Sequence, residues 1–153
     1  MAFANLMTAS SAMIAEGDTA AVLSLLKLTM TEIDAALDSM ERRDSVLPAE
    51  PGQEPRKLSV WLRDGTPRKL LVTEPNEAGA MTLESEYWFV NGELRAVQQP
   101  TAAFFFEADR ILLWTDEALD PITTITPEER MARELEILAE IEKRLAVFGI
   151  TLQ

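Results

Sequence analysis

Hydrophobic positions along the chain change their spacing twice. They recur every three or four residues over 18–43 and again over 126–148, and every second residue over 56–116. A step of three or four residues places side chains on one face of a helix, whereas alternation places them on one face of a strand. The pattern therefore predicts one α+β domain of 153 residues, with helix first, then antiparallel sheet, then helix.

The first helical region has a single apolar stripe. Its members are Val22, Leu26, Met30, Ile33, Leu37 and Met40. Asp18 follows a glycine and is a candidate N-cap. A weaker helical spacing precedes it over residues 3–14. We therefore expect helices within residues 1–43. A loop should follow over residues 44–55, because that segment carries three prolines and a glycine.

Turn residues divide the middle region into three hairpins. Asp64-Gly65 and Asn91-Gly92 each lie between two apolar arms, and Glu107-Ala108-Asp109 has the same place in the third unit. Asp-Gly and Asn-Gly favour a type I′ turn, which needs positive φ at both central residues. Strands adjacent in sequence usually pair. We expect an antiparallel meander of about six strands over residues 56–116.

A capping box precedes the last helical region. Thr126, Pro127 and Glu129 stand at the N-cap, N1 and N3 positions, and Gly149 stands at C′. The apolar stripe of this helix is Met131, Leu135, Leu138, Ile141, Leu145 and Phe148. We expect a helix over residues 126–149 that packs, with the N-terminal helices, on one face of the sheet.

Composition excludes several chemistries. The chain has no cysteine and no histidine, so disulfides, thiolate or imidazole ligands and a serine–histidine–acid triad are absent. Its net charge of −12 repels phosphate, and its basic residues form no stripe, so we expect no nucleic-acid partner. No apolar run approaches the roughly 20 residues of a membrane span. We expect no catalytic residue, metal or cofactor.

The start of the chain bears on its compartment. The stretch "MAFANLMTASSAMIAEGD" lacks the basic region and the continuous apolar segment of a signal peptide. We expect an exported or periplasmic protein if Met1 follows a removed signal peptide, and a cytoplasmic one otherwise.

The three turns also align as a loose internal repeat. The stretches "EYWFVNGELRAV" and "AFFFEADRILLW" resemble the "YYFxNGKLxFV … YYFxxxKLIRW" pattern of a loosely defined group of uncharacterised bacterial proteins, often exported or lipid-anchored. The resemblance covers about Lys57 to Glu117. It implies a small antiparallel sheet flanked by helices and transfers no catalytic residues. A more distant likeness is to membrane-occupation-and-recognition-nexus repeats, which use similar hairpins.

Alternation assigns aromatic side chains to opposite faces of the sheet. Tyr87 and Phe89 share the core face, whereas Trp61 and Trp88 fall on the more polar face. If the register allows, the two indoles form an aromatic patch there with Phe105. Such a patch, when exposed, marks a binding surface. The alternative is a second core, covered by the N-terminal segment or by the closing helix.

Two carboxylates share the face of Trp88. Glu84 and Glu86 are two residues apart, which separates their Cα atoms by about 7 Å along a strand. Paired carboxylates occur in glycosidases, but also on any solvent-facing strand, which is the interpretation favoured here. Asp116, Glu117 and Asp120 could supply oxygen ligands to calcium, yet the segment lacks the central glycine of a calcium loop.

We therefore expect a non-enzymatic interaction module. Its sheet face would bind a protein partner or a second copy of the chain, forming a homodimer. The candidate surface is Trp61, Trp88, Phe105, Glu84 and Glu86. The alternative function is a carrier that encloses an apolar small molecule or lipid between sheet and helices. An enzyme would have to work with carboxylates alone.

Overall fold

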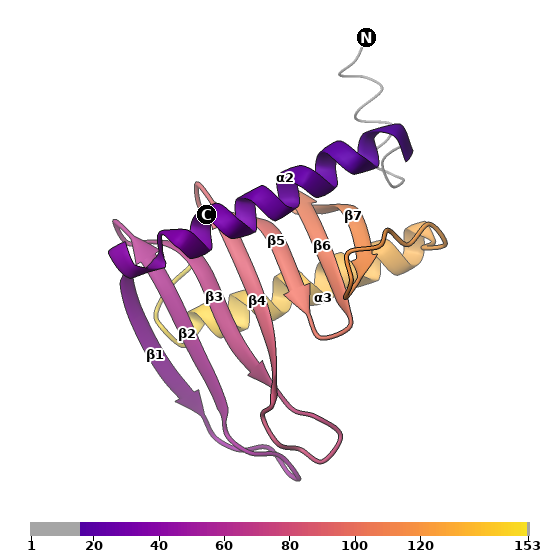
Figure 1. Cartoon of the computed structure of the whole chain (residues 1–153). Coiled ribbons are helices and arrows are strands. Elements are labelled where there is room, and N and C mark those ends of the chain that lie inside the picture. The colour runs from indigo at the N-terminus through magenta and orange to yellow at the C-terminus, as the bar shows by residue number, and fades with distance from the viewer. Residues whose placement is uncertain (1–15, 153) are drawn as a thin grey trace.

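The computed structural model of the protein describes residues 16–152. Seven strands form one antiparallel sheet in sequence order, between two long helices (Figure 1). The elements are α2 (Glu16–Ala35), the 3-10 helix η1 (Leu37–Ser39), β1 (Glu41–Leu47), β2 (Arg56–Arg63), β3 (Thr66–Glu74), β4 (Leu83–Val90), β5 (Glu93–Gln99), β6 (Ala102–Glu107), β7 (Arg110–Asp116) and α3 (Pro127–Ala146). The helical spacing predicted over residues 3–14 lies outside the described residues.

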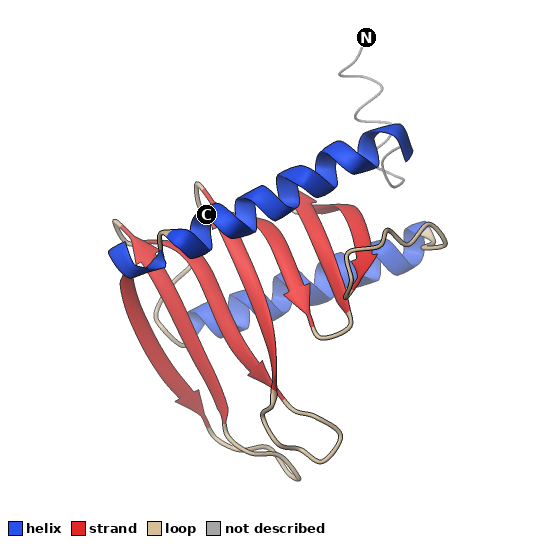
Figure 2. Cartoon of the chain, in the orientation of Figure 1, coloured by secondary structure: helices blue, strands red, loops and turns tan. Residues whose placement is uncertain are grey.

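The two helices cover opposite faces of the sheet (Figure 2). The prediction that both pack on one face was wrong. Strands near the middle of the sheet bury both sets of alternating side chains, and β6 is buried at every residue from Ala102 to Phe106. A sheet with two apolar faces needs a cover on each side. The larger core lies between the sheet and α3, and a smaller one lies under α2.

All three predicted turns are present, and the two that contain glycine have the predicted backbone. The pairs Asp64-Gly65 and Asn91-Gly92 both have φ values of 53° and 80°, and Ala108-Asp109 has values of 50° and 64°. Positive φ at both central residues defines a type I′ turn, whose twist matches that of the flanking strands. The third turn reaches this geometry without glycine. Ala108 therefore holds a left-handed conformation that costs an L-residue about 1–2 kcal/mol.

Each of these hairpins contains a β-bulge at the same distance from its turn. Register shifts occur at Trp61/Leu62, Trp88/Phe89 and Phe105/Phe106. The extra residues on the opposing strands are Arg68, Arg95 and Leu112, each four positions after the first turn residue. The loose repeat in the sequence therefore corresponds to a repeated structural unit, a type I′ turn followed by a bulge.

The seventh strand arises from a segment predicted as helix and loop. The apolar stripe of the first helix continues in sequence through Met40, but residues 41–47 form β1 and pair with β2 along its whole length. Pairing with a neighbouring strand here overrode the helical spacing, because residues 41–47 gain a full ladder of backbone hydrogen bonds with β2. Asp18 lies inside α2, which already includes Glu16, so Asp18 is not the N-cap.

The ends of α3 match the prediction. The Oγ1 atom of Thr126 accepts a hydrogen bond from the backbone N–H of Glu129 at 3.1 Å. Gly149 follows the helix with φ of 73°, and the N–H of Ile150 donates to the carbonyl of Leu145. Both ends follow capping rules that act within a few residues.

The buried face of α3 differs in part from the predicted stripe. Met131 is 56% exposed and Leu135 is 68% exposed, whereas Arg130 and Glu134 are buried. The reason is a polar contact with the sheet. Glu134 Oε1 accepts from the backbone N–H of Ile111 at 2.8 Å and from Arg130 Nη1 at 3.0 Å. Because of this contact, the first half of α3 faces the sheet with Arg130 and Glu134, and Met131 and Leu135 of the predicted stripe face solvent.

Candidate interaction face

The predicted aromatic residues lie in one row that crosses the sheet. The row follows the register from strand to strand and contains Arg42, Trp61, Lys69, Trp88, Ala96, Phe105 and Leu113. The hairpin repeat explains it, because Trp61, Trp88 and Phe105 each stand three residues before a turn. The structure therefore brings the three aromatic residues of the candidate surface onto one face.

Helix α2 covers most of this row. Trp88 and Phe105 are each 1% exposed and Trp61 is 9% exposed. Leu26 and Ile33 of α2 belong to the same apolar cluster as Trp88 and Phe105. Of the two predictions for this face, the exposed aromatic patch is wrong for these residues. The second core, covered by a helix from the N-terminal region, is what the structure contains.

A buried lysine fixes the end of α2 to this row. Lys69 Nζ lies 2.7 Å from Asp34 Oδ1, 2.9 Å from Glu86 Oε1 and 4.8 Å from the centroid of the Trp88 ring. Asp34 Oδ1 also accepts a hydrogen bond from Trp88 Nε1 at 2.8 Å. A buried ammonium needs such partners, since an unpaired one would not stay charged. Glu86 therefore acts as a counter-ion to Lys69.

Sequence reasoning missed Lys69 and Asp34. Lys69 was one half of an ordinary basic pair, and Asp34 lay off the apolar stripe of its helix. The available signal was that Lys69 stands on the same face as Trp61, as a cation within an otherwise aromatic row. Cations over indole rings are a recurring arrangement.

Beyond the aromatic row, the same side of the sheet is left uncovered by the two helices. In Figure 1, α2 crosses the strands near one end, and β1 to β4 extend past it. Register places two further rows of side chains there. We call this surface the open face, and its members are Asp44, Val46, Lys57, Ser59, Leu71, Thr73, Glu84, Glu86 and Gln98.

Most charges near the open face are already paired. Asp44 Oδ1 accepts from Ser59 Oγ at 2.6 Å and from Arg42 Nε at 2.9 Å. These two bonds, that from Ser59 first, hold the pKa of Asp44 below its ordinary value. The guanidinium of Arg42 also lies 5.1 Å from the centroid of the Trp61 ring.

Two charges of opposite sign remain on the open face. Lys57 and Glu84 take part in none of the ion pairs found among residues 16–152. Both side chains are exposed, and both neighbour Thr73: its register partner is Glu84, and its Oγ1 accepts from the Lys57 N–H at 2.8 Å. The open face therefore presents one free cation and one free anion on either side of a single residue.

The opposite face of the sheet contains a buried tyrosine. Tyr87 is 2% exposed and belongs to the core under α3, as predicted. Burial raises the pKa of Tyr87 to about 12, because the ionised phenol would lose its hydration. Nearby, Glu74 accepts from Ser85 Oγ and pairs with Arg56, so this carboxylate is also satisfied.

The remaining oxygen clusters form local structure. Asp116 Oδ1 accepts from the backbone N–H groups of Ala118 and Asp120 at 2.8 and 3.0 Å, as in an Asx turn. Among residues 16–152, no group of three or more acidic side chains is placed to hold a metal ion. Neither described helix has the length and apolar character to cross a membrane.

Comparison with protein-family models, with curated proteins and with solved structures finds no match for this chain. The resemblance to hairpin-containing bacterial proteins therefore stays a prediction. The fold itself defines the class, an α+β protein in which an antiparallel meander lies between two helices.

Proposed function

We propose that the protein is a non-enzymatic interaction module that associates with a second copy of itself through the open face. The free charges of Lys57 and Glu84 carry this proposal. A two-fold axis near Thr73 places Lys57 of each copy opposite Glu84 of the other, so one patch is complementary to itself. Dimers with two-fold symmetry require such a patch.

Apolar side chains on the same surface support face-to-face association. Val46 on β1 is 61% exposed, and Leu71 on β3 is partly exposed. The edge of the sheet is less suited to pairing with another copy. Glu41, Arg42, Arg43 and Asp44 are all exposed along β1. Charged side chains along an edge strand oppose strand addition.

A reciprocal charge swap tests this function. Sedimentation velocity over a range of protein concentrations at physiological ionic strength should show a monomer–dimer equilibrium. Lys57→Glu and Glu84→Lys should each weaken the dimer at least tenfold. In either single variant, the two-fold symmetry brings two pairs of like charges together across the interface. The double variant restores both pairs in swapped order and should recover most of the affinity.

A control separates this contact from the overall charge. Lys27→Glu makes the same charge change at an exposed position of α2, outside the open face, and should leave the dimer unchanged. A chain that stays monomeric at all concentrations would overturn the proposal, as would a double variant weaker than either single one.

One cavity favours a second function, the carriage of an apolar small molecule. It has a volume of about 570 Å³ and lies between α3, the C-terminal residues and the hairpin tips. Its apolar lining is Leu94, Ala108, Leu138, Ile141, Ala146, Ile150 and Leu152. Pockets that hold drug-sized ligands have volumes of about 300–1,000 Å³. Native mass spectrometry should then show a co-purified apolar ligand that Leu138→Trp displaces, and a ligand-free wild-type chain would contradict this function.

A further inference from the structure

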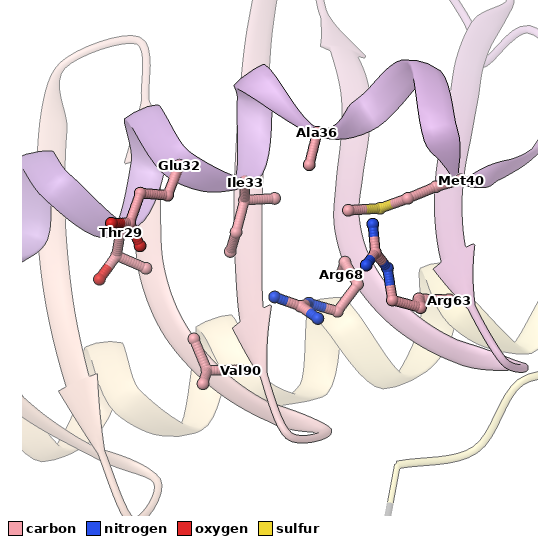
Figure 3. A pocket seen from close by; sticks show the side chains of 8 residues that line it. All are labelled: Thr29, Glu32, Ile33, Ala36, Met40, Arg63, Arg68 and Val90. Carbon is pink, nitrogen blue, oxygen red and sulfur yellow. The ribbon is translucent and has the colours of Figure 1, made fainter.

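A second cavity lies beneath the last turn of α2, at the end of the first hairpin. Its volume is about 270 Å³. Figure 3 shows the side chains of Arg63 and Arg68 among the residues that line it, with Ile33 and Met40 above them and Val90 below in that view. The cavity thus combines two cations with an apolar wall.

The β-bulge of the first hairpin turns Arg68 into this cavity. Lys69 pairs with Trp61 and Pro67 pairs with Leu62, so Arg68 is the residue without a partner in the ladder. A bulge interrupts alternation and re-aims the extra side chain. As a result Arg68 and Lys69 both reach the side of the sheet covered by α2, although they are adjacent in sequence.

The hairpin repeat shows that this pair of arginines is particular to the first unit. The positions equivalent to Arg63 and Arg68 are occupied by Val90 and Arg95 in the second hairpin and by Glu107 and Leu112 in the third. The repeated backbone therefore does not require a cation at either position.

The arginines of the cavity have few partners within the protein. Neither Arg63 nor Arg68 takes part in any ion pair found among residues 16–152. Arg63 Nη2 donates to Ser39 Oγ at 2.9 Å. The Nε atom of Arg68 is buried, and no acceptor in the described part of the chain reaches it. Buried donors without acceptors are uncommon in proteins, so the guanidinium of Arg68 is not fully satisfied by the described part of the chain.

We propose that this cavity binds a small organic monocarboxylate. The carboxylate would accept from the guanidinium groups of Arg63 and Arg68, a geometry in which arginine binds oxyanions strongly. The apolar part of the ligand would contact Ile33, Met40 and Val90. This site lies on the other side of the aromatic row from the open face, so the proposal is independent of self-association.

One acidic residue in the cavity determines which ligand charge the cavity favours. Glu32 also lines the cavity, and no ion pair in the described residues joins it to either arginine. Two cations and one anion leave a local charge of about +1, which matches a monoanion better than a phosphate dianion. The apolar wall likewise favours a carboxylate with a hydrocarbon tail over an inorganic anion.

Calorimetric titration with hexanoate tests the site directly. Hexanoate should bind the full chain with millimolar or tighter affinity. Hexanamide, which has the same shape without the charge, should bind at least tenfold more weakly, and inorganic phosphate should not compete. Amide shifts in an NMR titration should lie within residues 29–40 and near residues 63, 68 and 90.

Two variants with opposite effects separate binding from a structural role. Arg68→Met should weaken hexanoate binding at least tenfold, whereas Glu32→Gln should strengthen it severalfold, because it removes the competing negative charge. Arg110→Met is the matched control, since Arg110 is exposed, lies outside this cavity and belongs to none of the ion pairs above.

Three results would overturn the proposal. The first is no heat and no NMR shift with hexanoate at its solubility limit. The second is equal affinity for hexanoate and hexanamide. The third is an Arg68→Met affinity equal to that of wild type, with both proteins folded by circular dichroism.

Discussion

The two helices contact opposite faces of the sheet, and the proportion of apolar to polar contact differs between them. On the α3 side, a large core of aliphatic and aromatic residues reaches from β2 to β7 and includes Ile137, Ile141 and Leu145 of the helix. On the α2 side the apolar cluster is smaller, and only Leu26 and Ile33 of α2 are buried in it. Burial of apolar area is not directional, so a small cluster defines the position of a helix poorly.

Both helices nevertheless use one carboxylate to fix their position. Asp34 of α2 accepts from Trp88 Nε1 and pairs with Lys69, while Glu134 of α3 accepts from the N–H of Ile111. The difference lies in what surrounds these contacts. Glu134 supplements the larger apolar core, whereas Asp34 stands near the end of a helix that packs on the smaller apolar cluster. We infer that α2 depends on its polar contact more than α3 does.

Adjacent phenylalanines give the largest expected effects and compare the two cores directly. Phe104 faces the α3 side and Phe105 the α2 side, and both are buried. Phe104→Ala should lower the free energy of unfolding by about 4–5 kcal/mol and Phe105→Ala by about 3 kcal/mol, within the range for buried aromatic truncations. Phe104 loses more because its ring also packs on Trp114 at 5.1 Å between centroids. Urea denaturation measures both, and the reverse order would break the comparison.

The loss of stability at alkaline pH probes the α3 side through Tyr87. The pKa of Tyr87 rises from 10.0 unfolded to about 12 folded, so its contribution is complete below pH 10 and lost as pH rises to 12. The difference between these two pKa values corresponds to about 3 kcal/mol. Tyr87 is the one tyrosine of the chain, so absorbance at 295 nm reports its ionisation without overlap. A midpoint near pH 10 in the folded protein would contradict the prediction, and Tyr87→Phe corrects for lysines that titrate in this range.

Removal of the polar contact should affect the α2 side selectively. Asp34→Ala leaves Lys69 with Glu86 as its remaining carboxylate and leaves the Trp88 N–H without an acceptor. We expect a loss of about 1–3 kcal/mol. Hydrogen exchange should show faster exchange in α2 and little change in α3. Asp38→Ala, at an exposed position in η1, is the control and should change stability by less than about 0.5 kcal/mol. Equal loss of protection in both helices would show that α2 does not depend on this contact.

The smallest expected effect concerns the Ala108-Asp109 turn, which joins β6 to β7 and belongs to both faces of the sheet equally. Ala108→Gly relieves a left-handed residue at φ of 50° and should stabilise the protein by about 0.5 kcal/mol, after the entropic cost of glycine. Ala132→Gly, at an exposed position within α3, should instead destabilise it by about 1 kcal/mol. Thermal unfolding distinguishes the two signs. A loss of stability for Ala108→Gly would indicate that the turn tolerates alanine without strain.

The amino-acid sequence alone determined those features that depend on a few neighbouring residues. The turns at Asp64-Gly65 and Asn91-Gly92, the assignment of Trp88 and Tyr87 to opposite faces, and the caps of α3 all follow from local stereochemistry. Alternation survives even the bulges, because each bulge adds its extra residue to the strand opposite the aromatic one.

Tertiary structure alone decided what covers each face and which polar residues act together. Residues 41–47 become a strand because β2 offers an edge to pair with, which no local pattern reveals. Asp34 and Lys69 are 35 positions apart, and Arg68 enters its cavity only through a shift in register. Such contacts depend on how distant segments meet, because a charge is stabilised by the groups around it in space and those groups come from other elements of the fold.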